Sequence, residues 1–588
     1  MDFLDRLYAG FDTLVDRFGS LVWDTGITVG EEKIPFVVMV LLGTGVYLTL
    51  RLGFIQIRRL GHGFGVTSGK YDDPEEPGDV PHFQALTTAL SATVGIGNIA
   101  GVALAIHWGG PGALFWMWIT AFLGMATKFT EVTLAQEYRE VGPDVDPHKW
   151  EGSVSGGPMY YIERGLGPKW KPMAVFFAFM LGSVAFLTGN AIQANTVADA
   201  MQTEFGIAVW ITGIVTSTIV AMVILGGITR IGRVTSILAP VMAAIYVLGA
   251  LTIIFMNAPD ILPTFALIFQ EAFNPTAGVA GTGTGAFLVT LMWGVRRGLF
   301  SNEAGQGSAP IAHAAAKTDE PVSEGVVALL EPFIDTILIC TMTGLVIIMT
   351  GVYDDKVPTE VTLRGGDLTY VMVDERSGRH IEAEPDGTIR IEAGIQRVPQ
   401  GDPLIAWHEI ALDELFVDPE LTTPFTGTVD PAAGIATADD GTTYASLWGE
   451  AVENGAPLTT LGFQRGLPGR WGRFIVIASV LLFAISTAIS WSYYGDRSAN
   501  YLFGRRAVFP YKMAFVGMHF IGAVLPLTTI WDLGDVFLGI VIWPNLIALI
   551  LLAPVVVRLS KSYFERQPWL ENYQAHLRAK ERKRRGEE

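Results

Sequence analysis

The sequence contains few charged residues and almost no cysteine. Charged residues make up 17% of the 588 residues, against about 25% in ordinary soluble domains, so a soluble globular class is excluded. The single cysteine, Cys340, lies in an apolar run, which excludes a disulfide framework and a cysteine metal cluster. The nine histidines show no metal-ligand spacing such as H-E-x-x-H. The N-terminal segment lacks the basic start and short apolar core of a cleavable signal peptide.

Apolar residues dominate the composition instead. They make up 50% of the chain and the mean hydropathy is +0.38, values typical of a polytopic membrane protein. A transmembrane helix needs about 20 consecutive apolar residues. This criterion predicts about eleven all-α spans, at 34–52, 84–108, 111–136, 173–200, 207–227, 234–256, 281–299, 323–351, 472–494, 512–530 and 533–557.

Basic residues gather in every second loop. Arginines and lysines follow the first, third, fifth, ninth and eleventh spans, and Arg296, Arg297 and Lys317 accompany the seventh. Because loops rich in arginine and lysine stay in the cytoplasm, these loops are predicted to be cytoplasmic. We therefore expect a multi-pass protein of the plasma membrane, with its N-terminus outside and its C-terminus in the cytoplasm.

The spans divide the chain into five parts. An amphipathic segment, 1–33, precedes spans 1–8 in 34–350. Spans 9–11 in 471–558 precede a basic cytoplasmic tail, 559–588, which lies on anionic lipid headgroups or in solvent. Between them, 351–470 holds 21 acidic and 8 basic residues, a net −13 of the total −18. Its alternating apolar residues and turn sequences predict a β-rich extracellular insert, which is either a solvated elaboration or a partner-binding surface.

The second span has an unusual middle. Between 84 and 108 there is no Asp, Glu, Lys or Arg, but Gly95, Gly97 and Gly101 lower the helix propensity. In lipid, irregular backbone survives only where it lines a cavity or is buried in protein. A helix break here offers carbonyls to a cation and N–H groups to a carboxylate. A glycine-rich packing face between helices is the alternative.

A second glycine-interrupted stretch, 281–308, contains the seventh span. After the first span, ten spans remain, and they divide into two sets of five with opposite orientation. The two interrupted spans then occupy corresponding positions. Paired interrupted spans are typical of transporters built from inverted repeats, with the binding site at the breaks.

Six runs of the chain are long and distinctive: T-V-G-I-G-N-I-A-G-V-A (93–103), G-G-P-G-A-L-F-W-M-W (109–118), G-M-A-T-K-F (124–129), S-G-G-P-M-Y-Y-I (155–162), R-G-L-F-S-N-E-A-G-Q-G-S-A-P-I-A (297–312) and S-W-S-Y-Y-G (490–495). They resemble the alanine/glycine:cation symporter family, the sodium:alanine symporters, over nearly all of 34–350 and 455–557. The resemblance implies a LeuT-type fold, a five-plus-five inverted repeat preceded by one peripheral helix. It also implies a secondary active symporter that imports alanine and glycine with sodium, and sometimes with protons, by alternating access.

The resemblance further implies a sodium site. In LeuT-type carriers one sodium ion lies between carbonyls of the first repeat helix and hydroxyls of the eighth. The corresponding groups here are the carbonyls of Ser91 and Val94 and the hydroxyls of Ser486 and Thr487. A neutral oxygen set suits a monovalent cation. The alternative is that both hydroxyls bond carbonyls one turn back in their own helix.

The substrate carboxylate is expected at the break itself. The half-helix beyond the break presents its positive N-terminal end near Gly95, Gly97 and Asn98. Thr93, at the end of the preceding half-helix, belongs to the same predicted substrate site.

Three residues outside the break complete the predicted substrate site. Gln193 is an uncharged polar residue in the middle of the fourth span and is expected to accept the ammonium group; interhelical hydrogen bonding is its alternative role. Trp293 and Phe186 are expected to limit the size of the substrate side chain, and core packing is the alternative for both.

Four charged residues of the third and eighth predicted spans are singled out as candidates for function. A charge at a helix centre costs about 2.5–3.5 kcal/mol on insertion scales, so each is a candidate for function. Glu331 and Asp335 are candidates for proton or ion coupling, or for structural pairing with an arginine of the seventh span. Lys128 and Glu131 lie nearer the cytoplasmic end, where they can pair with each other or reach the interface.

Three other function classes stay open: a proton-coupled amino-acid carrier, an ion channel and a membrane enzyme. A channel needs a pore built by oligomeric symmetry or repeated filter loops, and the sequence has no repeated filter. The enzyme candidates Ser301, Glu303 and His313 fit no catalytic spacing. The expected partners are a small neutral amino acid and membrane lipid, with no nucleic acid, and a monomer is the favoured oligomeric state.

Overall fold

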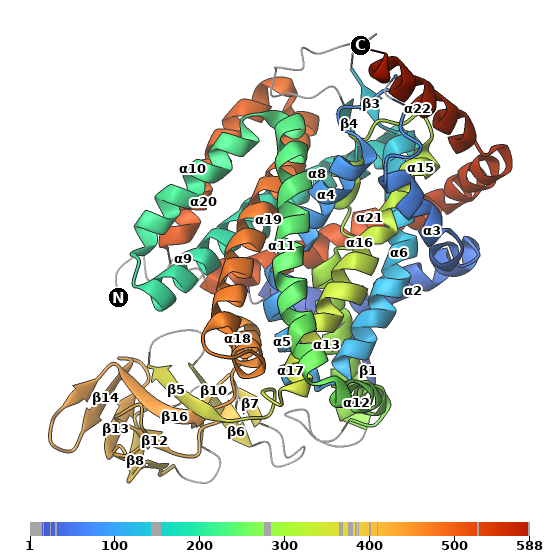
Figure 1. Ribbon diagram of the computed structural model, residues 1–588. Helices are drawn as coiled ribbons and strands as arrows, with labels where there is room; N and C mark the ends of the chain where they lie inside the picture. The colour runs from blue at the N-terminus through green and yellow to red at the C-terminus, as the bar shows by residue number, and fades with distance from the viewer. Residues whose placement is uncertain are drawn as a thin grey trace.

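Helices form most of the molecule, and most β-strands gather in one part between 357 and 451 (Figure 1). Outside it, β3 (Glu140–Val141) pairs with β4 (Val154–Ser155). The predicted amphipathic segment, 1–33, lies largely outside the described residues; within it, 17–23 are helical and β1 (Gly26–Val29) pairs with β2 (Glu32–Pro35). The computed structural model describes the chain except 1–14, 16, 24, 30–31, 74, 143–153, 276–283, 364–367, 374–379, 383–384, 386, 399–401, 409, 526–527 and 586–588.

Apolar helices make up the body of the protein. Six described helices are long and apolar enough to cross a membrane, or up to eight when each of two bent pairs counts as one span. This confirms a mainly helical, polytopic membrane protein, and the count of eleven spans stays a prediction. The helices are α2 (Phe36–Arg51), α3 (Ile55–Thr67), α4 (His82–Thr93), η1 (Gly97–Gly101), α5 (Val102–Gly109), α6 (Ala113–Glu137), α8 (Lys171–Phe186), η4 (Leu187–Ala191), α9 (Ile192–Phe205), α10 (Val209–Ile224), α11 (Gly227–Met256), α12 (Ile261–Phe273), α13 (Thr284–Asn302), α14 (Ala309–His313), α15 (Pro321–Ala328), α16 (Leu330–Pro332), η6 (Phe333–Cys340), α17 (Thr341–Met349), α18 (Gly455–Gly466), α19 (Trp471–Phe503), α20 (Val508–Val524), α21 (Thr528–Arg566) and α22 (Trp569–Arg584).

The second predicted span is a broken helix. α4 ends at Thr93, and the chain resumes helical turns from Gly97, with a bend of 55° between the two halves. Val94, between them, has a ψ of 89°, which is far from helical. The predicted break therefore lies at the glycines that the sequence singled out.

The seventh predicted span is interrupted as well. α13 ends at Asn302 and α14 starts at Ala309, and the turn between them contains Gly305 and Gly307 with φ of 96° and 79°. These left-handed values need glycine, because a Cβ would clash with the backbone. Arg296 and Arg297 lie inside α13, as they do inside the predicted span, and the helix continues three residues past the predicted span end at 299.

The segment 357–451 folds as three antiparallel sheets with their own apolar core. In strand order the sheets are β11-β10-β6-β7, β12-β16-β5 and β15-β14-β13-β8-β9. Buried residues alternate with exposed ones in β5 and β16, the pattern of strands with one solvated face. The strands are β5 (Val357–Thr362), β6 (Leu368–Val373), β7 (His380–Glu382), β8 (Ile389–Glu392), β9 (Ile395–Gln396), β10 (Leu404–Trp407), β11 (Ile410–Ala411), β12 (Leu415–Phe416), β13 (Gly427–Asp430), β14 (Ile435–Ala438), β15 (Thr443–Tyr444) and β16 (Ser446–Ala451).

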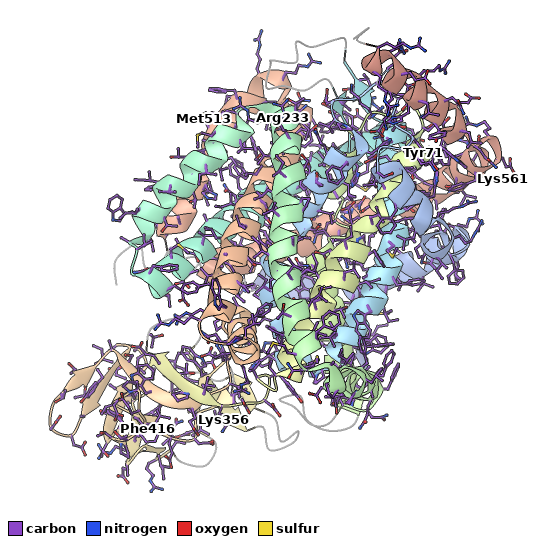
Figure 2. The ribbon with its side chains drawn as sticks, in the orientation of Figure 1. Tyr71, Arg233, Lys356, Phe416, Met513 and Lys561 are labelled. Atoms are coloured by element: carbon purple, nitrogen blue, oxygen red, sulfur yellow. The ribbon has the colours of Figure 1, made fainter. Side chains whose placement is uncertain are left out.

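The last residues of the predicted insert belong to the helical body. α18 follows the strands, and the Thr459 hydroxyl donates a hydrogen bond of 2.9 Å to the carbonyl oxygen of Ile99, at the broken helix. The β-structure thus occupies a narrower range than 351–470. It lies at one end of the molecule, where Figure 2 labels Lys356 and Phe416, and Arg233 and Met513 lie at the opposite end.

The basic tail packs against the protein. Arg566, at the end of α21, pairs with Glu320 at 2.7 Å, and the Trp569 ring lies 4.6 Å from the His62 ring of α3. Asn572 donates to Glu76 at 3.0 Å. The first half of α22 is therefore held by the loop before α4, in addition to any contact with lipid.

Candidate functional site

The two helix breaks lie side by side. The Asn98 side chain, on η1, accepts a hydrogen bond of 2.8 Å from the Gly95 N–H and donates one of 3.1 Å to the Ser301 hydroxyl on α13. It also donates to the Asp335 carboxylate of η6 at 2.6 Å, and the Ser301 hydroxyl donates to the same carboxylate at 2.6 Å. Asn98, Ser301 and Asp335 are fully buried. This hydrogen-bonded set fixes the two interrupted helices against each other.

Two hydroxyls of α19 face the end of α4. Thr487 donates to the carbonyl oxygens of Ser91 at 3.2 Å and Ala92 at 3.4 Å, and Ser486 donates to the Ser91 carbonyl oxygen at 3.4 Å. Ser486 also donates to Phe483, three residues back in its own helix, at 2.9 Å. Both hydroxyls thus meet the carbonyl of Ser91, one of the two carbonyls expected from the resemblance, and Ser486 makes the intrahelical bond of the alternative as well.

Glycine at position 95 permits this approach. A Cβ at Gly95 would lie 2.9 Å from the Thr487 hydroxyl oxygen, closer than real Cβ atoms come to their neighbours. Val94 is the first residue beyond α4, and the Ser91 hydroxyl is buried without a hydrogen-bond partner in the described chain. Oxygen atoms from two helices therefore gather at the point where α4 ends.

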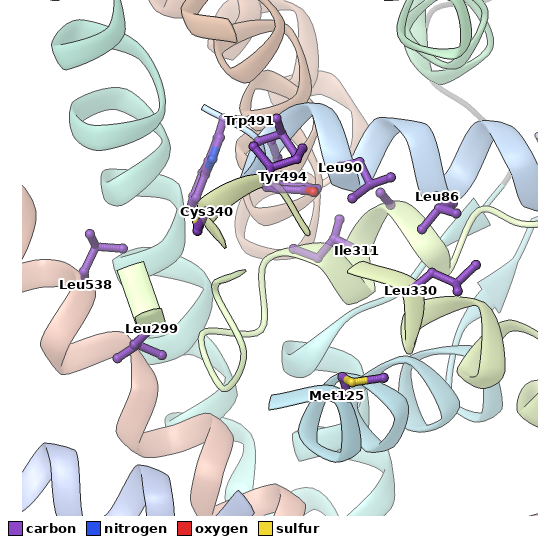
Figure 3. Close-up of a cluster of buried hydrophobic side chains, with 14 of the residues drawn as sticks. Leu86, Leu90, Met125, Leu299, Ile311, Leu330, Cys340, Trp491, Tyr494 and Leu538 are labelled. Carbon is purple, nitrogen blue, oxygen red and sulfur yellow. The ribbon is translucent and has the colours of Figure 1, made fainter. Parts of the chain in front are cut away.

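A small cavity opens beside these oxygens. Its volume is about 30 Å³, which is room for a few water molecules. Buried apolar side chains from α4, α13, α19 and α21 pack in this part of the molecule, among them Leu90, Leu299, Trp491 and Leu538 (Figure 3). The cavity is lined by Ala92, Thr93, Gly95, Ile96, Gly97, Thr188, Gln193, Phe300, Glu303, Gln306, Thr487, Trp491 and Leu538.

The cavity includes four of the seven predicted substrate residues, namely Thr93, Gly95, Gly97 and Gln193. Asn98 is not among the lining residues, because its side chain is engaged behind the break by Ser301 and Asp335.

The two aromatic residues lie elsewhere. Trp293 stacks on Trp108 with ring centroids 5.8 Å apart, and the Arg297 guanidinium lies 5.3 Å from the Trp293 ring. Phe186 packs on Tyr511, with ring centroids 4.7 Å apart. Neither lines the cavity.

Sequence reasoning missed several cavity residues. Glu303 and Gln306 come from the turn between α13 and α14, and Thr188 and Trp491 come from η4 and α19. The first two belong to the run S-N-E-A-G-Q-G-S that carried the family resemblance, which was a usable signal. For Thr188 and Trp491 no sequence signal separates the cavity wall from helix packing.

The buried charges pair differently from the prediction. Lys128 pairs with Glu331 at 3.1 Å, and neither side chain is exposed. His313 lies between two carboxylates, with one ring nitrogen 2.8 Å from Glu331 and the other bonded to Glu324. Glu131 instead accepts hydrogen bonds from Asn545 and from the Gly305 N–H. Pairing of Lys128 with Glu131, and of Glu331 with an arginine of α13, was therefore wrong: α16 brings the carboxylate of Glu331 to Lys128 of α6, and α14 brings the imidazole of His313 to Glu331.

A helical membrane body with a small polar cavity between two interrupted helices is the arrangement of a membrane transporter. The chain belongs to the sodium:alanine symporter family, which matches 24–378 and 433–576. The unmatched stretch, 379–432, lies within the β-structured segment.

Relatives are similar along nearly the whole chain. The sodium/alanine symporter AgcS of Methanococcus maripaludis is 39% identical over 94% of this chain and 98% of its own length. An uncharacterized transporter of Haemophilus influenzae is 38% identical over 94% of this chain and 96% of its own length. A putative sodium/proton-dependent alanine carrier protein, YrbD of Bacillus subtilis, is 32% identical over 90% of both chains.

Family membership fixes the general activity. The protein is a multi-pass membrane transporter and not an enzyme, and its class is the cation-coupled amino-acid symporters. The cation, the exact amino acids and the orientation in the membrane are finer questions.

Proposed function

We propose that this protein imports small neutral amino acids, alanine and glycine, together with sodium by alternating access. The observation that carries the proposal is the meeting of the Ser486 and Thr487 hydroxyls with the carbonyl of Ser91 at the end of α4. Hydroxyl and carbonyl oxygens are ligands that a hard cation prefers, and a set without carboxylates suits a single positive charge. We assign the sodium site to these oxygens and to the carbonyl of Val94.

The adjacent cavity supports a small substrate. Its volume of about 30 Å³ admits water but no amino acid, so the cavity must widen to bind substrate, and glycine and alanine require the least widening. The Gly95 N–H is bonded to the Asn98 side chain and the Asn98 N–H to the Gly95 carbonyl oxygen, so the support comes from the dipole of the helix that restarts at Gly97, which favours a negative group there. The substrate carboxylate therefore binds by Gly95 and Gly97, with Thr93 beside it.

A LeuT-type arrangement of eleven spans, with a five-plus-five inverted repeat, is consistent with these contacts. In that arrangement the interrupted spans of the two repeats face each other, as α4–η1 and α13–α14 do through Asn98 and Ser301. The basic loops support an orientation in the plasma membrane with the N-terminus outside, the C-terminus in the cytoplasm and the β-structured insert extracellular. A monomer is the proposed oligomeric state.

Proton coupling is the second candidate. A fully buried carboxylate, Asp335, contacts both breaks through Asn98 and Ser301, and a buried acid is the usual carrier of a transported proton. The name of the relative YrbD includes both sodium and the proton.

Uptake into proteoliposomes, with sodium and pH gradients imposed separately, tests the proposal. One sodium ion moving down 100 mV yields about 2.3 kcal/mol, which supports roughly 40–50-fold accumulation of a neutral amino acid. We expect a sodium gradient to drive accumulation of alanine and glycine, with weak competition from leucine, glutamate and lysine. Accumulation driven by the pH gradient alone would favour the proton-coupled candidate.

The sodium site is tested by a Ser486→Ala, Thr487→Ala double variant. Without the two hydroxyls, the sodium concentration for half-maximal uptake should rise tenfold or more, a loss of about 1.4 kcal/mol. Alanine binding at saturating sodium should change much less. Ser490→Ala is the matched control, because Ser490 is a buried serine one turn further along α19 whose hydroxyl has no partner in the described chain. If the double variant keeps its sodium dependence, the assignment of the sodium site to these two hydroxyls is wrong.

A further inference from the structure

The wall of the cavity contains a carboxylate. Glu303 lines it and has only 6% of its surface exposed. It is the one charged residue among the described residues that line the cavity. Sequence reasoning considered Glu303 only as part of an enzyme site, and gave the cavity no countercharge for a substrate.

The backbone at Glu303 is in a conformation that disfavours a large side chain. Its φ is +55°, in the left-handed region, and its N–H donates to the Leu299 carbonyl oxygen at 2.9 Å to end α13. Glycine or asparagine would occupy this conformation at lower cost. A glutamate here indicates a role for its carboxylate, because strained backbone of this kind gathers at functional sites.

The Glu303 carboxylate has no cationic partner within the described chain. It accepts a hydrogen bond from the Ser308 hydroxyl, which is neutral. The charged groups that act on it are Lys128, Glu331 and Asp335. Of these only Lys128 is positive, and its ammonium group is bonded to Glu331. A buried charge without a partner is strongly unfavourable, so a cation is expected to bind beside Glu303.

Three more oxygen atoms of the cavity wall lack partners. The side-chain oxygens of Thr188, Gln193 and Gln306 are buried without a hydrogen-bond partner in the described chain, and all three residues line the cavity with Glu303. The Gln193 amide nitrogen donates to the Thr188 carbonyl oxygen at 3.1 Å, so its side-chain oxygen remains the group to be satisfied. An ammonium group has three N–H donors and no acceptor, which matches a carboxylate with neutral acceptors around it.

We propose that Glu303 binds the α-ammonium group of the transported amino acid, and that the other two N–H groups donate to oxygens from the set Thr188, Gln193 and Gln306. This role rests on the proposed function, because it requires that an amino acid bind in this cavity. It makes the site selective for a zwitterion. The carboxylate end meets the start of the helix at Gly97 and the ammonium end meets Glu303, so a hydroxy acid of the same size leaves Glu303 unpaired.

The test compares alanine with lactate, which has a hydroxyl where alanine has the ammonium group. Each ligand competes with labelled alanine for binding to the purified protein in sodium, and the ratio of the two half-inhibitory concentrations is the readout. We expect lactate to compete more than about a hundredfold more weakly than alanine. In Glu303→Gln, which keeps the shape but removes the charge, the ratio should fall by about tenfold or more.

The matched control is Glu131→Gln. Glu131 is another fully buried carboxylate, on α6, which does not line the cavity. Its substitution should leave the lactate-to-alanine ratio as in the unchanged protein. If the Glu303 variant does not fold, the competition assay on the unchanged protein still tests the proposal. Strong competition by lactate or propionate with labelled alanine would overturn it.

Three results with a folded Glu303→Gln variant would also overturn it. Equal weakening of both ligands would mean that Glu303 only supports the fold. An unchanged ratio with lost response to a pH gradient would make Glu303 a proton carrier. An unchanged ratio with a raised sodium requirement would make it a sodium ligand. Failure of the proposed function is distinguishable, since the unchanged protein would then show no sodium-driven alanine uptake.

Discussion

In the helical body, Lys128 and Glu331 form an ion pair in which neither side chain is exposed, whereas in the β-structured insert Arg390 and Asp439 pair at the surface. The insert keeps its interior apolar, with Ile391 among the fully buried residues. The helical body does the opposite and gathers acids, histidines and a lysine inside.

The difference locates the function. Burying a charge costs free energy, so buried charges persist where they bind a ligand, couple transport to an ion or specify one structure. Surface ion pairs contribute little to stability. All cavity residues and all buried ion pairs described above belong to the helical body, in its helices or in the breaks between them. The family model also leaves 379–432, the middle of the insert, unmatched, while it matches the helical body and both ends of the insert.

A labelling experiment separates the two ends of the molecule by an all-or-none effect. Cysteine placed at Glu420, an exposed residue of the insert, should react with an impermeant thiol reagent added to intact cells. Cysteine at Arg505, exposed between α19 and α20, should react only after the cells are opened. The native Cys340 is buried and gives a low background. If only the cysteine at Arg505 reacts in intact cells, the proposed orientation in the membrane is wrong.

Removing a charge should damage the helical body far more than the insert. Lys128→Met leaves Glu331 buried with one cationic partner fewer, and loss of one member of a buried pair costs about 3–5 kcal/mol. We expect the melting midpoint of the purified protein in detergent, followed by tryptophan fluorescence, to fall by many degrees. A Lys128→Met, Glu331→Gln double variant should recover part of the loss.

Arg390→Ala is the control in the insert and should leave the midpoint close to its original value. Arg390 donates two hydrogen bonds to Asp439 and holds the pKa of that carboxyl below its usual range. A lowered pKa stabilises the fold above the unfolded pKa, so this small contribution is present at neutral pH and is lost as acid protonates Asp439. Equal effects of Lys128→Met and Arg390→Ala would contradict the comparison.

Excision of the insert should have the smallest effect on transport. Val357 and Ala451 are paired in adjacent antiparallel strands, so a short Gly-Ser linker can join them in place of 358–450. We expect sodium-driven alanine uptake within about twofold of the unchanged protein, a difference near 0.4 kcal/mol.

One contact that excision removes is between His408 of the insert and His107 of α5, whose ring centroids lie 6.3 Å apart. If the shortened protein is folded and monodisperse but does not transport, the insert takes part in the mechanism through this contact. His107→Phe in the full-length protein would then reproduce the defect.

The sequence by itself determined the class and the family. Low charge and long apolar segments indicate a polytopic helical membrane protein because lipid admits few other structures. Glycines at 95 and 97 identify the first break, since backbone geometry depends on local residues. Long motifs such as 297–312 identify the family, as the family match along the chain confirms.

Only the tertiary structure decided which side chains meet. Glu303, Gln193 and Thr487 are far apart in the chain and come together because three helices converge on one cavity. Lys128 has a nearer acid in sequence, Glu131, yet pairs with Glu331 from another helix. Sequence spacing specifies neighbours within one helix. Contacts between helices depend on packing of the whole body, so the partners of a buried charge follow from the fold.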